Sequence, residues 1–321
     1  MKAAVVRELG RSPSYGEFEE PSPRTGETLI SVSASAVSRL VRGRSSGAHY
    51  SADDAPPFVP GIDGIGRTDR GRHVYFAFPR SPFGALAERC VVSDARIMDA
   101  PDGPDDASLA AAANPGMSCW IPLTRLAPVR PDEAVLINGA TGTAGQMAVQ
   151  VARYLGAPSV IATARDEAKL ERLGELGADV RIPLQPPMDA FRETVRKVAR
   201  EKNVGTVLDY LWGPSTEAIL EALGGPNAPR GPSRVRFVEV GGVAGPTIAL
   251  SGAVLRSSGV ELLGTGLGSS SNVDLFRGIG EFLQAFAKAR FRIAVDVHPL
   301  SEIDRAWDSA DPAKRLVFTV P

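Results

Sequence analysis

The sequence has few of the residues that build disulfide frameworks and metal sites. Among its 321 residues are two cysteines, Cys90 and Cys119, and three histidines. Two cysteines are too few for a framework of several disulfides or for a zinc site with four thiolate ligands. Both lie among apolar residues, so we expect them to be buried free thiols.

Net charge and long apolar runs are also missing. Lysine and arginine total 36 and aspartate and glutamate 37, which gives a formal net charge of -1. No overall basic field is therefore present to hold nucleic acid or an anionic membrane. No run approaches the roughly 18 apolar residues of a membrane span, and no secretory pattern follows Met1. We expect a cytoplasmic protein that binds neither nucleic acid nor membrane.

The chain has three stretches of different texture. Residues 1–112 are rich in glycine, proline and serine and contain short strand-like runs, and residues 45–60 predict a long loop. Residues 113–257 alternate apolar strands with helices, as in a parallel sheet covered on both faces. Residues 258–321 return to short strands around one helix. The predicted fold class is α/β, with a Rossmann-type doubly wound sheet inserted into a small β-barrel domain made of residues 1–112 and 258–321.

A glycine-rich turn lies between the first strand of the middle stretch, residues 134–137, and its first helix, residues 143–156. Gly142 and Gly145 have the spacing of the last two glycines in a Gly-x-Gly-x-x-Gly turn, while Ala140 stands at the first position. Gly142 allows a pyrophosphate to approach the backbone, and Gly145 allows the helix to pack on the strand. Because a strand precedes the turn and a second strand follows about twenty residues later, the pattern indicates dinucleotide binding.

The end of the second strand predicts which coenzyme is bound. NAD sites place an acidic residue there, whereas an arginine suits the 2′-phosphate of NADP. Here Thr163 and Ala164 end the strand, Arg165 follows, and Lys169 lies one helical turn beyond. Asp166 is also suited to cap the next helix. We favour NADPH, bound by Arg165 and Lys169.

With these motifs the sequence resembles the zinc-free quinone oxidoreductase (ζ-crystallin-like) branch of the medium-chain dehydrogenase/reductase superfamily, nearly end to end. The family's motifs are matched by Met1-Lys2-Ala3, by Pro60–Gly66, by the Ala140–Gly145 turn, by two Leu-Gly-Ala segments at 155–157 and 176–178, and by Val207-Leu208-Asp209-Tyr210. The resemblance implies that the outer domain is GroES-like. It also implies a homodimer that pairs edge strands near residues 260–266.

The resemblance also implies which residues bind the coenzyme. Thr163, Arg165 and Lys169 would line the adenosine ribose, and Ser118 stands where relatives have a threonine near the nicotinamide. The remaining cofactor-binding candidates are Gly142, Thr143, Ala144 and Gly145 at the pyrophosphate, Leu211, Trp212, Val240, Gly241 and Gly242 along the coenzyme, and Gly264, Thr265, Gly266 and Leu267 near the nicotinamide.

The sequence departs from the family pattern at two places. Zinc-dependent relatives have a Cys in the region of residues 35–40 and a His-Glu pair near Pro60, and this chain has neither, so we expect no metal. Many quinone reductases have Asn and Asp where Ser38 and Val41 stand here. For proton delivery the early loops offer Tyr50, His49 and Ser38, while His73 and His298 on strand-like runs are expected to be structural.

Three hypotheses of function follow. The favoured one is an NADPH-dependent enzyme that transfers hydride, without a metal, to a quinone or an α,β-unsaturated carbonyl. A second is an enoyl-thioester reductase, in which Arg39, Arg42 and Arg44 would attract phosphopantetheine if they did not simply belong to a solvated loop. A third is a non-catalytic NADPH-binding sensor or structural protein.

Overall fold

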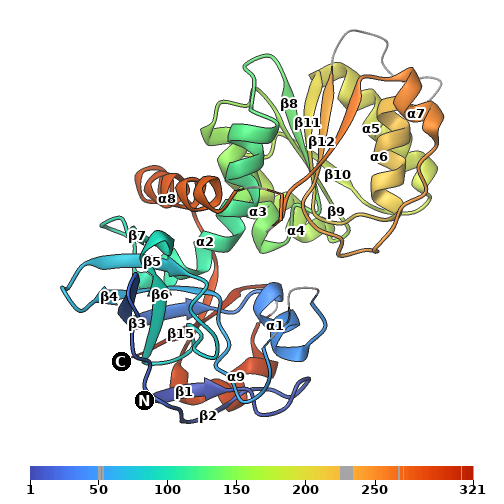
Figure 1. The fold of residues 1–321 in the computed structure, drawn as a ribbon. Helices are drawn as coiled ribbons and strands as arrows, with labels where there is room; N and C mark the ends of the chain where they lie inside the picture. The colour runs from blue at the N-terminus through green and yellow to red at the C-terminus, as the bar shows by residue number, and fades with distance from the viewer. Residues whose placement is uncertain are drawn as a thin grey trace. The chain divides into compact units, whose positions relative to one another are not determined.

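The chain folds into two compact units (Figure 1). The computed structural model describes residues 1–49, 52, 54–224, 234–266, 268–269, 271–311 and 313–320. The first unit contains Met1–Asn114 and Ile279–Pro321, and the second contains Pro115–Gly278. The divisions fall inside two helices, α2 (Asp106–Ile121) and α8 (Asn272–Ala289).

The second unit is built on a parallel sheet of strand order β10-β9-β8-β11-β12-β13. The strands are β8 (Ala134–Asn138), β9 (Val160–Ala164), β10 (Val180–Pro183), β11 (Val204–Asp209), β12 (Val235–Glu239) and β13 (Val260–Gly264). This order is that of a Rossmann doubly wound sheet, in which the strand order reverses between the first and fourth strands. Here the reversal lies between β8 and β11, so their carboxyl ends flank the crevice where such sheets bind ligands.

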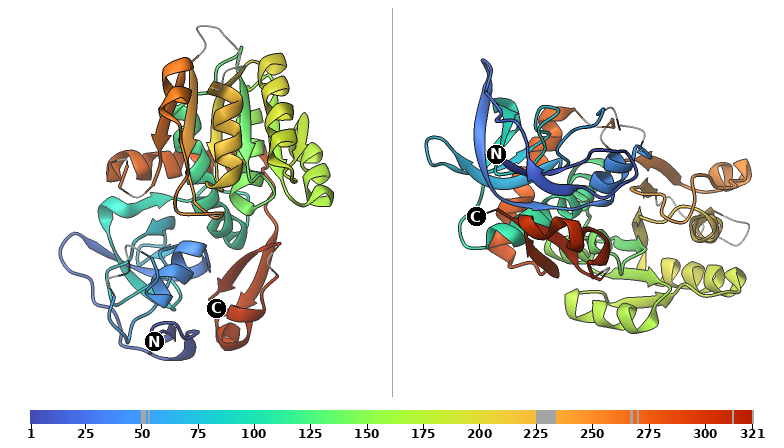
Figure 2. Two further views of the ribbon diagram at one scale, coloured as in Figure 1. Left: turned by 90° about the vertical axis from the view of Figure 1, so that its right-hand side faces the viewer. Right: turned by 90° about the horizontal axis from the view of Figure 1, so that it is seen from below.

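Helices cover both faces of this sheet (Figures 1 and 2). Its strands are almost continuously apolar, and Leu136, Ile161, Val207 and Phe237 form part of one buried core. The covering elements are α3 (Thr143–Tyr154), α4 (Glu167–Arg172), the 3-10 turn Leu173–Leu176, α5 (Met188–Lys202), α6 (Pro214–Gly224) and α7 (Gly252–Ser257), and a π-helical segment, Pro122–Leu126, follows α2. The α/β class and the doubly wound sheet are thus confirmed.

The first unit is built on a mixed sheet of order β14-β15-β3-β4-β5-β7, with β6 also paired to β3. Its strands are β3 (Glu27–Ala36), β4 (Asp63–Thr68), β5 (His73–Ala77), β6 (Arg89–Ser93), β7 (Ile97–Asp99), β14 (Val295–Pro299) and β15 (Arg315–Thr319). A hairpin of β1 (Lys2–Val5) and β2 (Ser14–Glu17) joins them, with helices α1 (Arg39–Ser46) and α9 (Ile303–Ser309) and 3-10 turns at Asp94–Arg96 and Leu300–Glu302. Because β15 pairs with β3, strands from the first and last parts of the chain belong to one sheet.

The structure differs from the sequence-based expectations at three places. Residues 258–278 belong to the second unit, because β13 pairs with β12 at the edge of the parallel sheet. Residues 39–46 form α1 instead of a loop, and α2 begins before the boundary placed at residue 112. Both cysteines are buried free thiols, as expected, and burial raises the pKa of each. Among the described residues, no helix is long and apolar enough to cross a membrane.

Candidate functional site

The glycine-rich turn leaves β8 at its carboxyl end and leads directly into α3. Gly139 has a φ of 85°, and the N–H groups of Gly139 and Ala140 donate to the carbonyl of Thr163 at 3.1 and 2.9 Å. The left-handed residue of the turn is therefore Gly139, which explains why alanine is tolerated at 140. The turn is a Gly-x-x-Gly-x-x-Gly pattern that begins one residue before the position the sequence motif suggested.

The N-terminus of α3 is open to a ligand. Gly142 is its N-cap and has no side chain to accept a hydrogen bond from the first turn. A Cβ at Gly142 would have only the Gly139 carbonyl oxygen within 4 Å, at 3.9 Å. The N–H groups at Thr143, Ala144 and Gly145 are thus unoccupied by a cap, and the helix dipole favours an anion there.

Gly145 performs a different role from Gly142. A Cβ at this position would lie 2.6 Å from both the Cα of Ala140 and the carbonyl oxygen of Gly139. These are backbone atoms, so no side chain could move to relieve the contact. Gly145 therefore allows α3 to pack directly on the turn that leaves β8, which is the role predicted for it.

A buried polar network lies beneath this turn at the ends of β8, β9 and β11. The Asn138 amide donates to Asp209 Oδ1 at 2.8 Å and to Ser215 Oγ at 3.0 Å, and it accepts from Thr163 Oγ1 at 2.6 Å. Thr216 Oγ1 donates to the other oxygen of Asp209. Burial raises the pKa of Asp209. The network joins the two strands that flank the crevice, so it fixes the positions of their carboxyl ends.

The same carboxylate holds the loop that follows β11. Asp209 Oδ1 accepts the N–H groups of Leu211 at 3.0 Å and Trp212 at 3.3 Å, and Trp212 has a φ of 57°. The Asp209 carbonyl accepts from Val240 at 2.8 Å and Gly241 at 3.2 Å. Asp209 and Asn138 were not among the predicted site residues, although the Val-x-Asp-Tyr motif contained one of them.

The predicted ribose-binding residues divide into two groups. The side chain of Thr163 is fully buried and bonded to Asn138, so the prediction that it lines the ribose is not supported by its orientation. Arg165 is exposed beyond the end of β9, and no hydrogen bond or ion pair joins it to another described residue. Asp166 caps α4 by accepting the Lys169 N–H at 3.0 Å, and it also pairs with the Lys169 ammonium at 3.4 Å. Of the two cations, Arg165 is therefore the better placed to bind a ligand phosphate beyond the end of β9.

The remaining predicted coenzyme residues lie at or just beyond the carboxyl ends of β12 and β13. Gly242 lies in the loop after β12, where a Cβ would meet the Gly245 carbonyl oxygen at 2.8 Å. Thr265 follows β13 and donates its N–H to the Glu239 carbonyl at 3.0 Å. Gly264 and Gly266 have open space where a Cβ would lie. Leu267 lies outside the described residues.

Two hydroxyl groups of the second unit lie close together. Ser118, on α2, donates to the Pro115 carbonyl at 2.7 Å, and its Oγ lies 3.4 Å from the hydroxyl of Tyr210, which directly follows β11. Burial raises the pKa of Tyr210 well above its usual value. Tyr210 therefore stays protonated at neutral pH and can act as a hydrogen-bond donor.

Three residues were predicted for proton delivery, and the structure describes two of them, Ser38 and His49. The Ser38 hydroxyl is buried and caps α1 by accepting the Val41 N–H at 3.1 Å, so it serves the helix. The pKa of His49 is lowered by burial and by Arg44, which keeps the imidazole neutral at pH 7. Tyr50 lies outside the described residues.

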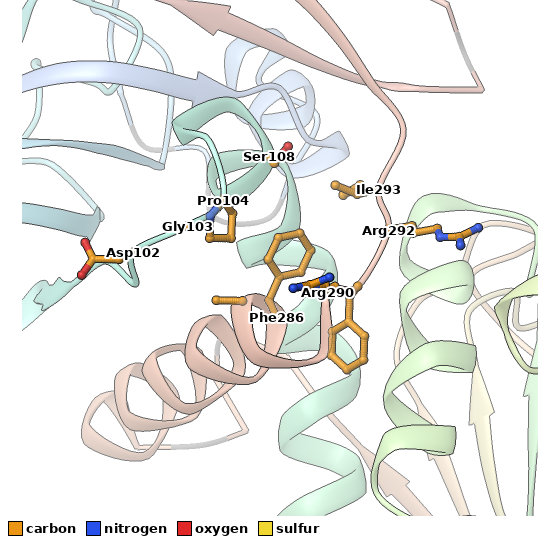
Figure 3. A pocket seen from close by; sticks show the side chains of 10 residues that line it. Asp102, Gly103, Pro104, Ser108, Phe286, Arg290, Arg292 and Ile293 are labelled. Carbon is orange, nitrogen blue, oxygen red and sulfur yellow. The ribbon is translucent and has the colours of Figure 1, made fainter.

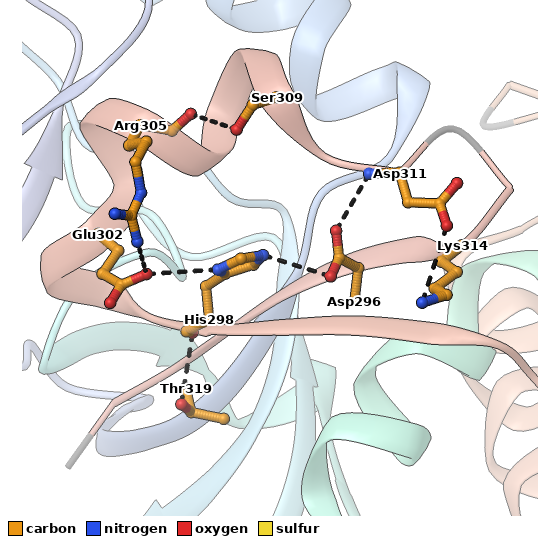
Figure 4. Close-up of polar contacts among 8 residues, drawn as sticks. All are labelled: Asp296, His298, Glu302, Arg305, Ser309, Asp311, Lys314 and Thr319. Atoms are coloured by element: carbon orange, nitrogen blue, oxygen red, sulfur yellow. Dashed lines mark hydrogen bonds and ion pairs between the residues drawn. The ribbon is translucent and has the colours of Figure 1, made fainter.

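The two histidines expected to be structural both contact carboxylates of the first unit. His73 Nε2 lies 2.8 Å from Asp106 Oδ1. His298 lies between Asp296, at 3.3 Å, and Glu302, at 3.4 Å (Figure 4). Within the described part of the chain, no group of three or more His, Cys, Asp or Glu side chains is arranged to hold a metal ion.

The motif residue Asp63 belongs to a buried polar cluster in the first unit. It accepts from the Tyr75 hydroxyl at 2.9 Å and interacts electrostatically with Arg315, which donates to Asn114 at 3.1 Å. Burial raises the pKa of Asp63 to about 6, against the opposing effects of Tyr75 and Arg315. Burial also lowers the pKa of Arg315 to about 10.

Stability of the first unit is expected to fall as pH rises from about 4 to 6. Since the folded pKa of Asp63 lies above its usual 3.8, the folded state binds the proton more tightly, and this advantage is lost as the carboxyl ionises. The difference corresponds to about 3 kcal/mol. Thermal unfolding across pH 4–7 should show this slope in the wild type and lose it in Asp63→Asn. Parallel profiles would contradict the assignment, and Asp99→Asn, at an exposed site, is the control.

Comparisons with known proteins agree with this geometry. Residues 144–284 match the zinc-binding dehydrogenase family. The chain is 29% identical to the probable NADPH-dependent quinone reductase of Emericella nidulans, with 96% of each chain covered. It superimposes with a TM-score of 0.79 and 26% identity on the quinone oxidoreductase of Thermus thermophilus, solved also with NADPH, over 99% of this chain and 100% of that one. It is also 31% identical over 70% of its length to the phthioceranic/hydroxyphthioceranic acid synthase of Mycobacterium bovis, of which it spans 10%.

Proposed function

We propose that the chain is an NADPH-dependent reductase of the quinone oxidoreductase-like branch of the medium-chain dehydrogenase/reductase superfamily, acting without a metal on quinones or α,β-unsaturated carbonyls. The observation that carries the proposal is the open N-terminus of α3, at the point where the strand order of the sheet reverses. NADPH, when bound, supplies the hydride.

The residues at this site fit a dinucleotide. The N–H groups at Thr143, Ala144 and Gly145 would bind the pyrophosphate, and the space beside Gly142 admits it without a steric obstacle. The Asn138–Asp209 network holds the turn and the loop after β11 rigidly, which reduces the entropy lost on binding.

Arg165 is the residue that we expect to select NADPH over NADH. A guanidinium bound to the 2′-phosphate contributes about 1.5–3 kcal/mol, so Arg165→Ala should weaken NADPH binding by roughly 10- to 100-fold and leave NADH binding within about twofold. Fluorescence titration with both coenzymes measures this. Arg172→Ala removes an exposed arginine of α4 and should change neither affinity. Equal losses for both coenzymes in Arg165→Ala would refute the role given to Arg165.

Reduction of an enone adds a hydride to the β-carbon and a proton to the resulting enolate. Ser118 and the protonated Tyr210 would orient the reacting groups through their hydroxyls. For the proton we propose solvent, His49 or Tyr50. Since the Ser38 hydroxyl is already an N-cap, Ser38 is the weakest of the three candidates named from the sequence.

Turnover separates the reductase from a non-catalytic coenzyme-binding protein. NADPH oxidation should be measured with simple quinones, alkenals and enoyl thioesters in parallel, and repeated with NADH. We expect steady oxidation of NADPH with a quinone or an alkenal. Tight NADPH binding without turnover of any acceptor would favour the sensor or structural protein instead.

An enoyl-thioester reductase is the second candidate, favoured by the match to part of the phthioceranic/hydroxyphthioceranic acid synthase of Mycobacterium bovis. Such an enzyme is expected to attract phosphopantetheine with a basic surface, but two of the three arginines predicted to form that surface are bonded within the protein. Arg42 donates to the Trp307 carbonyl at 2.6 Å and lies over its ring, and Arg44 pairs with Asp54 at 2.9 Å. Arg39 alone of the three arginines is exposed with no partner among the described residues. Oxidation of NADPH with enoyl thioesters, and not with quinones or alkenals, would establish this alternative.

We also propose a homodimer formed through β13. This strand is at the edge of the parallel sheet, and Leu262 exposes 39% of its surface there. An apolar edge strand is a ready surface for pairing with a second copy. Sedimentation should show a dimer for the wild type and a monomer for Leu262→Glu. A wild type that stays monomeric at micromolar concentration would contradict the proposal, and Val297→Glu, at an exposed residue of the other unit, is the control.

A further inference from the structure

A pocket of about 650 Å³ lies in the first unit, between the start of α2 and the end of α8 (Figure 3). Such a volume is within the range of small-molecule sites, about 300–1,000 Å³. None of the residues assigned to the coenzyme lines it. Its walls include Pro104, Ser108, Phe286, Arg290, Phe291 and Ile293.

One wall of the pocket is formed by aromatic rings that pack on one another. The rings of Phe286 and Phe291 pack edge to face, with centroids 6.3 Å apart and planes at 68°. Phe282, which is fully buried, stacks on Phe291 at 6.3 Å. Because Phe282 and Phe286 both pack on Phe291, the exposed part of the Phe291 ring is held in place as an apolar surface of the pocket wall.

Arg290 stands beside this wall in a backbone conformation that favours glycine. It directly follows α8, has a φ of 55°, and precedes Phe291, whose N–H donates to the Phe286 carbonyl at 3.3 Å. This is the helix-terminating turn in which glycine is usual at the left-handed position. The Arg290 side chain is exposed and makes no hydrogen bond or ion pair with another described residue. No such contact therefore offsets the cost of its left-handed backbone. A costly backbone conformation kept by a charged residue at a pocket indicates a functional role.

The charges around the pocket restrict the ligand. In Figure 3 the Arg290 side chain lies next to Phe286, whereas the side chains of Asp102 and Arg292 point away from it. The Asp105 carboxylate accepts from both the N–H and the hydroxyl of Ser108, at 2.9 and 2.8 Å. The Asp105 carboxylate, bonded to Ser108 of the pocket wall, disfavours a dianion, while the guanidinium of Arg290 beside two aromatic rings favours a single negative charge on a flat apolar body.

We propose that this pocket is a second small-molecule site, which takes a planar aromatic monocarboxylate. Arg290 binds the carboxylate, and Phe286 and Phe291 contact the ring. The site is independent of the proposed coenzyme site, so coenzyme binding and carboxylate binding can fail separately.

Titration with 2-naphthoate tests the proposal. For a ligand of this size we expect a Kd of about 0.1–1 mM for the wild type, unchanged by saturating NADPH. Arg290→Gln should weaken binding about tenfold or more, and Lys288→Gln, an exposed cation of the same helix end that does not line the pocket, should change it less than about twofold. The neutral 2-naphthalenemethanol should bind about tenfold more weakly than 2-naphthoate and equally to wild type and Arg290→Gln. No binding to the wild type, equal binding of 2-naphthoate to Arg290→Gln, or displacement by NADPH would overturn the proposal.

A second pair of variants separates ligand binding from folding. Arg290→Gly relieves the left-handed strain and should raise Tm by about 2 °C, whereas Arg290→Ala keeps the strain and should not. Both variants should lose 2-naphthoate binding. A lower Tm for Arg290→Gly than for the wild type would show that the guanidinium serves the fold and would also overturn the proposal.

Discussion

Alanine at position 145 is expected to weaken NADPH binding on the order of 100-fold. The added Cβ would lie 2.6 Å from backbone atoms of Gly139 and Ala140, so α3 must move away from the turn. Overpacking of this kind costs about 1–3 kcal/mol. The displaced N–H groups would no longer converge on the pyrophosphate. Equilibrium titration with NADPH measures the loss, and circular dichroism checks that the variant is folded.

Two other glycines provide the comparison. Gly142→Ala should fold normally, because the added Cβ meets nothing closer than 3.9 Å, but it should still weaken NADPH binding by filling space that the pyrophosphate needs. Gly16→Ala, in β2 of the other unit, meets only a flexible arginine end at 3.7 Å and should leave the affinity unchanged. Wild-type affinity in Gly145→Ala would show that coenzyme does not bind at this turn.

Replacing Asp209 with alanine should cause the largest loss of stability. The change removes the acceptor of the Asn138 amide, the Thr216 hydroxyl and the N–H of Leu211, all at the carboxyl ends of buried strands. Each buried donor left without a partner costs about 1–3 kcal/mol, so the second unit should lose about 3 kcal/mol or more. Thermal unfolding should show a Tm lower by about 10 °C.

Matched variants distinguish the network from a general effect of losing a carboxylate. Asp209→Asn keeps the shape and one acceptor oxygen, so its Tm should fall less than half as far. Asp189→Ala, at an exposed site on α5, should lie within about 0.5 kcal/mol of the wild type. A Tm for Asp209→Ala within about 2 °C of the wild type would mean that the network does not hold these strand ends together.

Local patterns allow most of the second unit to be predicted. The apolar runs at 134–137, 160–163 and 204–208 correspond to β8, β9 and β11 with bounds within one residue at each end. Buried parallel strands are apolar on both faces, so their signal does not depend on distant residues. The turn at Gly142 and Gly145 is predictable for the same reason, since its spacing follows from the geometry of one strand, one turn and one helix.

Features that depend on distant contacts are not predictable in this way. The pairing of β13 with β12 assigns residues 258–278 to the second unit, and nothing in the run 260–264 indicates which sheet it joins. Asn138 and Asp209 are 71 residues apart, and only the fold brings them within 2.8 Å. The short sequence of α1, rich in arginine and serine, predicts a loop because it has no clear apolar period, although Ser38 is a good N-cap.

Titration of the purified wild-type protein with NADPH and NADH, followed by the fluorescence of the reduced nicotinamide, tests the central claim most directly. With the N–H groups of α3 binding the pyrophosphate and Arg165 the 2′-phosphate, NADPH should saturate one site per chain at micromolar concentration and bind at least about tenfold more tightly than NADH. Absence of saturable binding by either coenzyme would contradict the assignment of this site.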